Sequence, residues 1–202
     1  AHLQRVGVCH RDLSLENVVI DEFTQSAIID LGMCLRVPYH CNETGGVTDV
    51  TRGSLRRLLL PSGAVGKMWY MAPEVVLNKD PFDGFSVDIW ATGVILFLML
   101  VGRPPWELAA DENSYFRQVA VHGMDRMPDQ LTSLDQCGLG RLVQVYNRTI
   151  SLEAADLLQR ILVADPRQRY SLVNILDHPW FDLELETQED RAPNEPWRND
   201  GM

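Results

Sequence analysis

The sequence predicts a fold that is mostly α-helical, with a small β-hairpin and a long loop. Apolar residues recur at helical spacing through most of the chain from residue 86 onward. Two short apolar runs, residues 18–20 and 27–29, come earlier and are separated by a polar segment, as in a hairpin. Residues 33–71 show little periodicity and contain five glycines, which predicts a long loop.

The composition is that of one globular unit with a buried core. The chain has 202 residues, of which 46% are hydrophobic and 23% are charged. Its net charge of -10 and pI near 4.9 argue against nucleic acid or an anionic membrane as partner, because both favour a basic surface. The longest apolar stretch, residues 89–101, is shorter than the roughly 20 residues of a membrane-spanning helix. We therefore interpret it as a buried core helix.

The cysteines indicate a reducing compartment. They form no CxxC pair and lie at no zinc-finger spacing; they are Cys9, Cys34, Cys41 and Cys137. We expect free thiols and an intracellular, cytoplasmic protein.

The elements are expected in the following order. The chain opens with the helical spacing of His2, Leu3 and Val6, so the sequence reads as a fragment that begins inside a longer helix. The hairpin and the long loop follow. Helices are predicted at residues 86–101, 112–122, 151–162 and 171–177, with Ser86 and Ser151 as N-caps. Residues 182–202 form an acidic tail that we expect to be flexible.

Five motifs in this order resemble the protein kinase family. Residues 10–17 match the catalytic loop H-R-D-L-x-x-x-N, residues 30–32 resemble the metal-binding triplet, and residues 72–74 match the A-P-E that ends the activation segment. Residues 88–93 resemble the central helix of the C-lobe. The fifth is the closing pattern of Asp165, Pro166 and Arg169 with residues 178–181.

The resemblance covers residues 1–181 and implies an α+β fold class, in the form of the mostly α-helical C-lobe of a kinase domain. It assigns residues 30–74 as the activation segment. The N-lobe motifs are absent from the sequence, namely the glycine-rich loop, the strand lysine and its partner glutamate. The resemblance also implies two architectural features: an ion pair between Glu74 and Arg169, and hydrogen bonds from the catalytic-loop backbone to Asp88.

The resemblance assigns a role to each candidate site residue. Asp12 is the catalytic base that orients the substrate hydroxyl. Asn17 and Asp30 bind the Mg²⁺ that bridges the phosphates of ATP. Val19 and Ile29 border the adenine, although ordinary core packing explains Ile29 equally well.

Two positions depart from the family pattern together. Ser14 stands where serine/threonine kinases usually have lysine, and Lys67 stands where they have threonine. We expect the two to have exchanged places, with the Lys67 ammonium as a catalytic group that reaches Asp12 and the γ-phosphate, while Ser14 makes a local hydrogen bond. The alternative is that Lys67 points to solvent or pairs with a loop phosphate.

The resemblance implies a serine/threonine protein kinase that transfers the γ-phosphoryl group of ATP to protein substrates. Residues 1–202 alone are expected to be inactive without an N-lobe. An upstream activating kinase is also expected, with Arg11 receiving a phosphate placed on Ser62. The alternative is a pseudokinase-like docking or scaffold module without catalysis.

Overall fold

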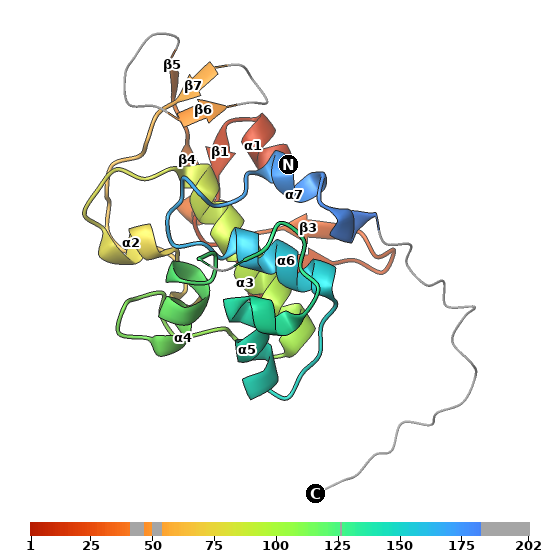
Figure 1. The fold of residues 1–202 in the computed structure, drawn as a ribbon. Helices are drawn as coiled ribbons and strands as arrows, with labels where there is room; N and C mark the ends of the chain where they lie inside the picture. The colour runs from red at the N-terminus through yellow and green to blue at the C-terminus, as the bar shows by residue number, and fades with distance from the viewer. Residues whose placement is uncertain (41–46, 50–53, 126, 183–202) are drawn as a thin grey trace, which may run out of the picture.

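A computed structural model describes residues 1–40, 47–49, 54–125 and 127–182. The predicted flexible tail lies almost entirely outside these residues, as do Cys41 and part of the predicted activation segment. The architecture is that of a helical domain whose elements surround one long central helix (Figure 1).

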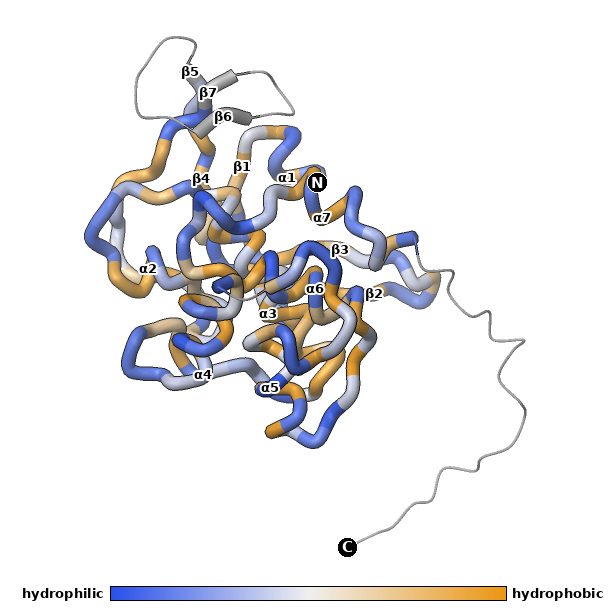
Figure 2. The backbone as a smooth tube through the Cα atoms, viewed as in Figure 1, coloured by the Kyte–Doolittle hydropathy of each residue, from blue (hydrophilic) through white to orange (hydrophobic). Residues whose placement is uncertain are grey.

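The central helix, α3 (Gly84–Val101), is apolar on nearly all its faces and is buried accordingly. Trp90 and Phe97 are fully buried, and Figure 2 shows the tube of α3 mostly in the hydrophobic colour. The helix is long and apolar enough to cross a membrane, but 67% of it is buried inside the protein, as in a core helix.

The start of α3 differs from the expectation. Its N-cap is Asp83, whose carboxylate accepts from the amide of Phe85 at 3.1 Å. Ser86 lies inside the helix instead, and its hydroxyl accepts from Arg169 at 3.1 Å. Both residue types cap helices well, so the sequence pattern alone did not distinguish them.

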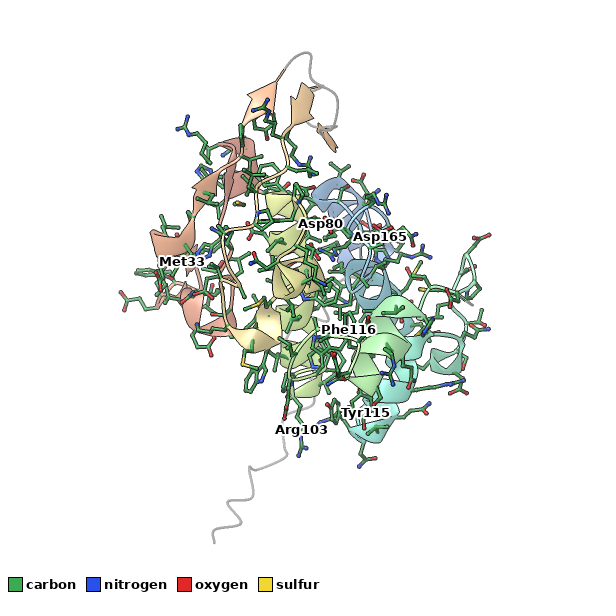
Figure 3. The ribbon with its side chains drawn as sticks, turned by 90° about the vertical axis from the view of Figure 1, so that its left-hand side faces the viewer. Met33, Asp80, Arg103, Tyr115, Phe116 and Asp165 are labelled. Carbon is green, nitrogen blue, oxygen red and sulfur yellow. The ribbon has the colours of Figure 1, made fainter. Side chains whose placement is uncertain are left out.

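The C-terminal helices pack on one side of α3, and the N-terminal strands lie on the other (Figure 3). α6 (Leu152–Ile161) and α7 (Leu172–Leu176) begin after Ser151 and Ser171, each of which accepts from a backbone amide three residues on. α4 (Ser114–Phe116) continues as the π-helix η4 (Arg117–Val121), within the region predicted to be helical. The shorter helices are α1 (His2–Arg5), η1 (Leu15–Asn17), η2 (Leu31–Met33), η3 (Met68–Tyr70), α2 (Pro73–Leu77), η5 (Leu134–Gln136) and η6 (Pro179–Phe181).

The sequence pattern did not predict α5 (Gly138–Val145), an additional helix between η4 and α6. It contains Gly138 and Gly140, and glycine disfavours helix formation by about 1 kcal/mol relative to alanine. These glycines have a packing role. A Cβ at Gly138 would collide with the carbonyl oxygen of Gln118, and one at Gly140 with that of Leu134. Close backbone packing therefore explains a helix that propensity does not favour.

The strands are short and antiparallel. β2 (Val18–Ile20) pairs with β3 (Ser26–Ile28) as the predicted hairpin, with Val18 opposite Ile28. β1 (Val8–Cys9) pairs with β4 (Leu35–Arg36). A three-stranded sheet in the order β5-β7-β6 occupies the predicted long loop, formed by β5 (Tyr39–His40), β6 (Val47–Asp49) and β7 (Ser54–Arg56). The expectation of a loop without strands was therefore wrong.

The β2–β3 hairpin is exposed although its residues are apolar. Ile20 is 70% exposed, Phe23 72% and Ile28 45%. Its strands are paired to each other but have little of the protein packed against them. An exposed apolar edge of this kind indicates a contact surface.

Candidate active site

The catalytic loop is fixed to the core through Asp88 of α3. The amides of His10 and Arg11 donate to its two carboxylate oxygens at 2.7 and 2.8 Å. Burial raises the pKa of Asp88 to about 6, although the two amide bonds favour the ionised form. This arrangement, which the resemblance implied, holds the loop at a defined distance from the central helix.

His10 links the loop to Ile29, the residue that follows β3. Its ring is fully buried, with Nε2 3.1 Å from the carbonyl oxygen of Ile29 and Nδ1 accepting from the amide of Asp12 at 3.3 Å. Because both ring nitrogens are used in these contacts, His10 has a packing role. Arg11 has a left-handed backbone with φ of 70°. Non-glycine residues in this conformation cluster at functional sites.

Asp12 lies between the catalytic loop and the segment that precedes α2. The amide Nδ2 of Asn17 donates to the carbonyl of Asp12 at 2.8 Å and lies 3.4 Å from its carboxylate. From the other side, the backbone amide of Lys67 donates to Oδ1 of Asp12 at 3.2 Å. Gly66 makes this approach possible, since a Cβ there would lie 2.9 Å from the carbonyl oxygen of Arg11.

Asp30 is placed beside this loop by its neighbour. The amide of Ile29 donates to the carbonyl of Asn17 at 2.9 Å, which brings the two predicted metal ligands onto adjacent backbone segments. Asp30 itself has a left-handed backbone with φ of 61°. Among the described residues, its exposed carboxylate accepts only a long contact from the amide of Gly32 at 3.4 Å.

Val19 and Ile29 expose apolar surface on the backbone segments that carry Asn17 and Asp30. Val19 is 40% exposed and Ile29 is 43% exposed. Of the two interpretations of Ile29, core packing is the one that this exposure disfavours.

The side chain of Lys67 does not take the expected position. Its ammonium donates to Oγ of Ser14 at 2.7 Å and lies 3.5 Å from Oε2 of Glu16, whereas only its backbone amide reaches Asp12. Ser14 and Lys67 are therefore direct partners, with fully buried Ser14 as the acceptor. The lysine side chain is 41% exposed, and its ammonium contacts Ser14 instead of the carboxylate of Asp12.

Glu16 was not singled out from the sequence. Its own backbone amide lowers the pKa of its carboxyl, and Ser14 and Lys67 add to this effect, so Glu16 is ionised at neutral pH. It follows Ser14 by two positions in the charged stretch, but only the fold brings Lys67 to it from 51 residues away.

Two further contacts involve residues singled out from the sequence, and one of them, the ion pair of Glu74 with Arg169, was expected. Nη2 of Arg11 donates to the hydroxyl of Ser62 at 2.9 Å. Arg169 forms a bidentate ion pair with Glu74, with N to O distances of 2.8 and 3.0 Å, and its guanidinium is fully buried. The ion pair ties the end of the activation segment to the C-terminal helices.

The donor set fits magnesium held jointly with phosphate. Among the described residues, no group of three or more histidine, cysteine, aspartate or glutamate side chains could hold a metal alone. Nδ2 of Asn17 donates to Asp12, which leaves Oδ1 of Asn17 available. Within the part of the chain that the structure describes, the carboxylate of Asp30 has only the long contact with Gly32. Mg²⁺ favours such oxygen ligands and completes its shell with phosphate oxygens and water.

Comparison with known proteins agrees with this geometry. The sequence matches the family described as "Protein kinase domain" over residues 1–181. It is 32% identical over 183 residues to the probable serine/threonine-protein kinase KCC4 of Saccharomyces cerevisiae, covering 89% of this chain and 14% of that protein. It is 34% identical over 183 residues to the serine/threonine-protein kinase SAPK2 of Oryza sativa subsp. indica, covering 90% of this chain and 44% of that protein.

The chain thus spans less than half the length of either relative, while both matches cover most of the chain itself. The family match includes residues 10–17, residues 30–74 and α3 to α7. The chain belongs to the protein kinase family, and its relatives are serine/threonine kinases.

Proposed function

We propose that this chain carries the catalytic-loop and metal-binding half of a serine/threonine protein kinase. The observation that supports this most directly is the setting of Asp12. Its carboxylate is held between Asn17 and the amide of Lys67, on a loop fixed to the core by Asp88. A carboxylate oriented in this way can accept the proton of a substrate hydroxyl.

In the proposed reaction, Asp12 orients the serine or threonine hydroxyl of a protein substrate. Oδ1 of Asn17 and the carboxylate of Asp30 would hold Mg²⁺. Val19 and Ile29 would contact the adenine through their exposed surfaces. When bound, MgATP would supply the phosphoryl group, and its Mg²⁺ would neutralise part of the phosphate charge.

Lys67 would supply a positive charge from the activation segment instead of from the catalytic loop. Its ammonium is anchored on Ser14, two residues after Asp12. A cation at this place can stabilise charge that develops on the transferred group. The contact with Glu16 is long and exposed, so it leaves the ammonium free to move toward a phosphate.

Arg11 and Ser62 would form the regulatory contact. A phosphate on Ser62 would add roughly -1.5 to -2 charge within reach of the Arg11 guanidinium and would strengthen the existing contact. Phosphorylation of Ser62 by an upstream kinase would then stabilise the activation segment through Arg11.

The proposal is tested in a chimera that joins residues 1–202 to the N-lobe of an active serine/threonine kinase. We expect phosphorylation of a protein substrate, and Asp12→Asn should lower kcat by roughly 10²- to 10⁴-fold. Asp30→Asn should lower activity and increase the Mg²⁺ concentration required. Asp177→Asn, which changes an exposed aspartate on α7's C-cap, is the matched control. A folded chimera that binds ATP but transfers no phosphate would instead support the docking-module alternative.

The role of Lys67 is tested in the same chimera. Lys67→Met should lower kcat by roughly 10²- to 10³-fold, as expected for loss of one preorganised donor. The double change Ser14→Lys with Lys67→Thr should recover much of that loss by restoring the usual family arrangement. An unchanged kcat in Lys67→Met would show that the ammonium serves only to bind Ser14.

A further inference from the structure

The chain between β7 and the candidate active site is attached to the start of α3. This stretch, the 56–67 segment, lies within the predicted activation segment. Leu59 pairs with Phe82 in an antiparallel bridge, in which the amide of each residue donates to the carbonyl of the other, at 2.7 and 2.9 Å. Both side chains are buried. Farther along the segment, the amide of Gly63 donates to Oδ1 of Asn78 at 3.1 Å.

An ion pair fixes the first residue of this segment to the N-cap of α3. Arg56 donates from Nε to Oδ1 of Asp83 at 3.0 Å and from Nη2 to Oδ2 at 2.5 Å. The two side chains are 14% and 9% exposed, and the guanidinium lies 5.1 Å from the centre of the Phe85 ring. Asp83 also accepts from the amide of Phe85, so the helix orients its carboxylate. A bidentate pair with so little exposure holds both groups in one geometry.

The other end of the 56–67 segment meets the catalytic loop. The backbone amide of Lys67 donates to Oδ1 of Asp12 at 3.2 Å. The catalytic loop is fixed to α3 through Asp88, and Arg56 fixes the segment to the start of the same helix. Because one helix anchors both backbone segments, the ion pair contributes directly to where the Lys67 amide meets Asp12.

We propose that the ion pair of Arg56 with Asp83 is a positioning device, which holds the 56–67 segment against Asp12 without phosphorylation of the segment. Kinase activation loops are commonly ordered when an added phosphate pairs with an arginine. Here Arg56 pairs with a carboxylate of the protein itself, which supplies the negative charge permanently. A phosphate on Ser62 would add to an arrangement that already exists. The effect on catalysis rests on the proposed function, whereas the effect on the position of the segment does not.

The position of the segment is tested by hydrogen exchange in the full chain of 202 residues, whose measured mass establishes that it carries no phosphate. In Arg56→Gln and in Asp83→Asn, the amides of Leu59 and Lys67 should exchange faster by about 10-fold or more. Asparagine caps helices as well as aspartate does, so Asp83→Asn keeps the hydrogen bond to Phe85 and removes only the charge. The amides of α6 should keep their original exchange rates.

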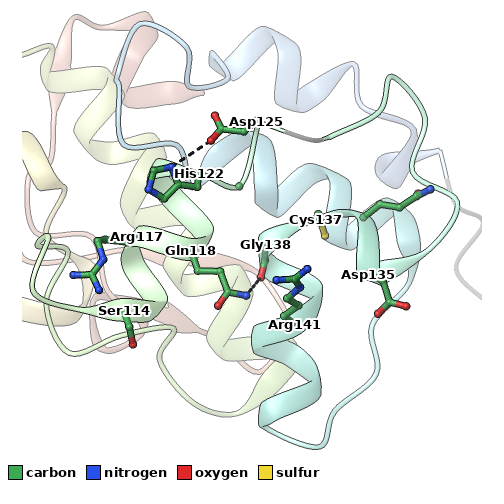
Figure 4. Close-up of a pocket in the computed structure, with 11 residues that line it drawn as sticks. Ser114, Arg117, Gln118, His122, Asp125, Asp135, Cys137, Gly138 and Arg141 are labelled. Carbon is green, nitrogen blue, oxygen red and sulfur yellow. Dashed lines mark hydrogen bonds and ion pairs between the residues drawn. The ribbon is translucent and has the colours of Figure 1, made fainter.

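Two further variants show whether the ion pair itself is responsible. The double variant Arg56→Gln with Asp83→Asn should exchange no faster than the faster single variant, because both changes remove one shared interaction. Arg141→Gln changes the net charge as Arg56→Gln does, at an exposed arginine of α5 outside the 56–67 segment (Figure 4). It should leave the exchange rates of the segment unchanged.

The effect on catalysis is tested in the chimera of the proposed function after treatment with a phosphatase. Arg56→Gln should lower kcat by about 10-fold or more, because the groups around Asp12 lose their alignment. The KM for ATP should stay unchanged, since Val19 and Ile29, the residues assigned to the adenine, lie outside the segment. Arg56→Lys keeps the positive charge without the bidentate geometry, so it should restore part of the lost kcat.

Three outcomes would overturn the proposal. Unchanged exchange rates in both single variants would show that the ion pair does not position the segment. Equally faster exchange in α6 would show that the ion pair only stabilises the fold. Protection of the Lys67 amide that develops only after phosphorylation of Ser62 would assign the positioning to the phosphate. A chimera that is inactive in every form would contradict the proposed function instead, while the exchange rates would still decide the role of the ion pair.

Discussion

The core around α3 and the edge around the catalytic loop use similar apolar residues in opposite ways. Phe97 and Leu158 are fully buried, whereas Ile29 is 43% exposed and Leu31 is 57% exposed. Burying a large apolar side chain stabilises a fold by roughly 1.5–3 kcal/mol, and an exposed one contributes little of this. The comparison indicates that the core determines stability, while the edge leaves apolar surface that the described residues do not cover.

The polar groups of the core and of the edge around the catalytic loop also differ in burial. Asp88 and Arg169 are buried and each has several hydrogen-bond partners, whereas Asp30 is exposed and has one long contact with the described residues. A buried polar group without hydrogen-bond partners lowers the stability of the fold, so the polar groups of the core need partners within the protein. The edge can leave oxygens available for a ligand.

The largest expected effect is the difference in unfolding free energy between a substitution in the core and one on the exposed hairpin. Phe97→Ala should lower the free energy of unfolding by roughly 3–5 kcal/mol, because it opens a cavity beside α3. Phe23→Ala, at a position 72% exposed on the hairpin, should change it by less than about 0.5 kcal/mol. Urea denaturation of the full chain measures both. Equal losses would mean that the hairpin belongs to the folding core.

The next effect concerns the buried ion pair. Glu74→Gln removes the charge that compensates the fully buried Arg169 guanidinium, and it should cost roughly 3 kcal/mol. Asp165→Asn removes the partner of Arg167 instead, an ion pair in which the arginine is 86% exposed, and should cost about 0–1 kcal/mol. Thermal unfolding compares the two. A larger loss of stability in Asp165→Asn than in Glu74→Gln would contradict the expectation that the buried ion pair matters more.

The pH dependence of stability tests the anchor of the catalytic loop. The pKa of Asp88 is about 6 in the folded protein, above its ordinary value, so the folded state binds the proton more tightly than the unfolded state. Stability from this group is therefore present at low pH and is lost as pH rises from about 4 to 6, by at most about 3 kcal/mol.

Asp88→Asn cannot ionise and should lack this component. The difference in unfolding free energy between wild type and variant, measured across pH 4 to 7, isolates it, because the other carboxylates are common to both. Parallel profiles would show that Asp88 titrates at an ordinary pKa despite its burial.

The smallest effect is expected at the edge. Glu16→Gln removes an exposed contact of 3.5 Å to Lys67, so stability should change by less than about 1 kcal/mol. Glu22→Gln, on the exposed hairpin, is the control. A loss above about 2 kcal/mol would show that Glu16 supports the fold as well as the site.

Local sequence patterns predicted the helices with strong signals. The residues 151–162 helix was confirmed as α6 and the residues 171–177 helix as α7, because a serine cap and a regular apolar face coincide in each. The hairpin was confirmed for the same local reasons. α5 and the β5-β7-β6 sheet were missed. Their stability depends on neighbours distant in the sequence, through glycine packing against η4 in one case and strand pairing in the other.

The sequence by itself determined which residue types form the candidate site, because the H-R-D-L-x-x-x-N and A-P-E patterns name their positions. It also determined the central helix, whose apolar residues can be stable in water only when buried. The tertiary structure alone decided which atoms meet. Lys67 lies 53 residues from Ser14 along the chain. Its ammonium donates to the Ser14 hydroxyl, while its backbone amide donates to the carboxylate of Asp12. Sequence spacing carries no information about such contacts, since they depend on how Gly66 lets two distant backbone segments approach each other.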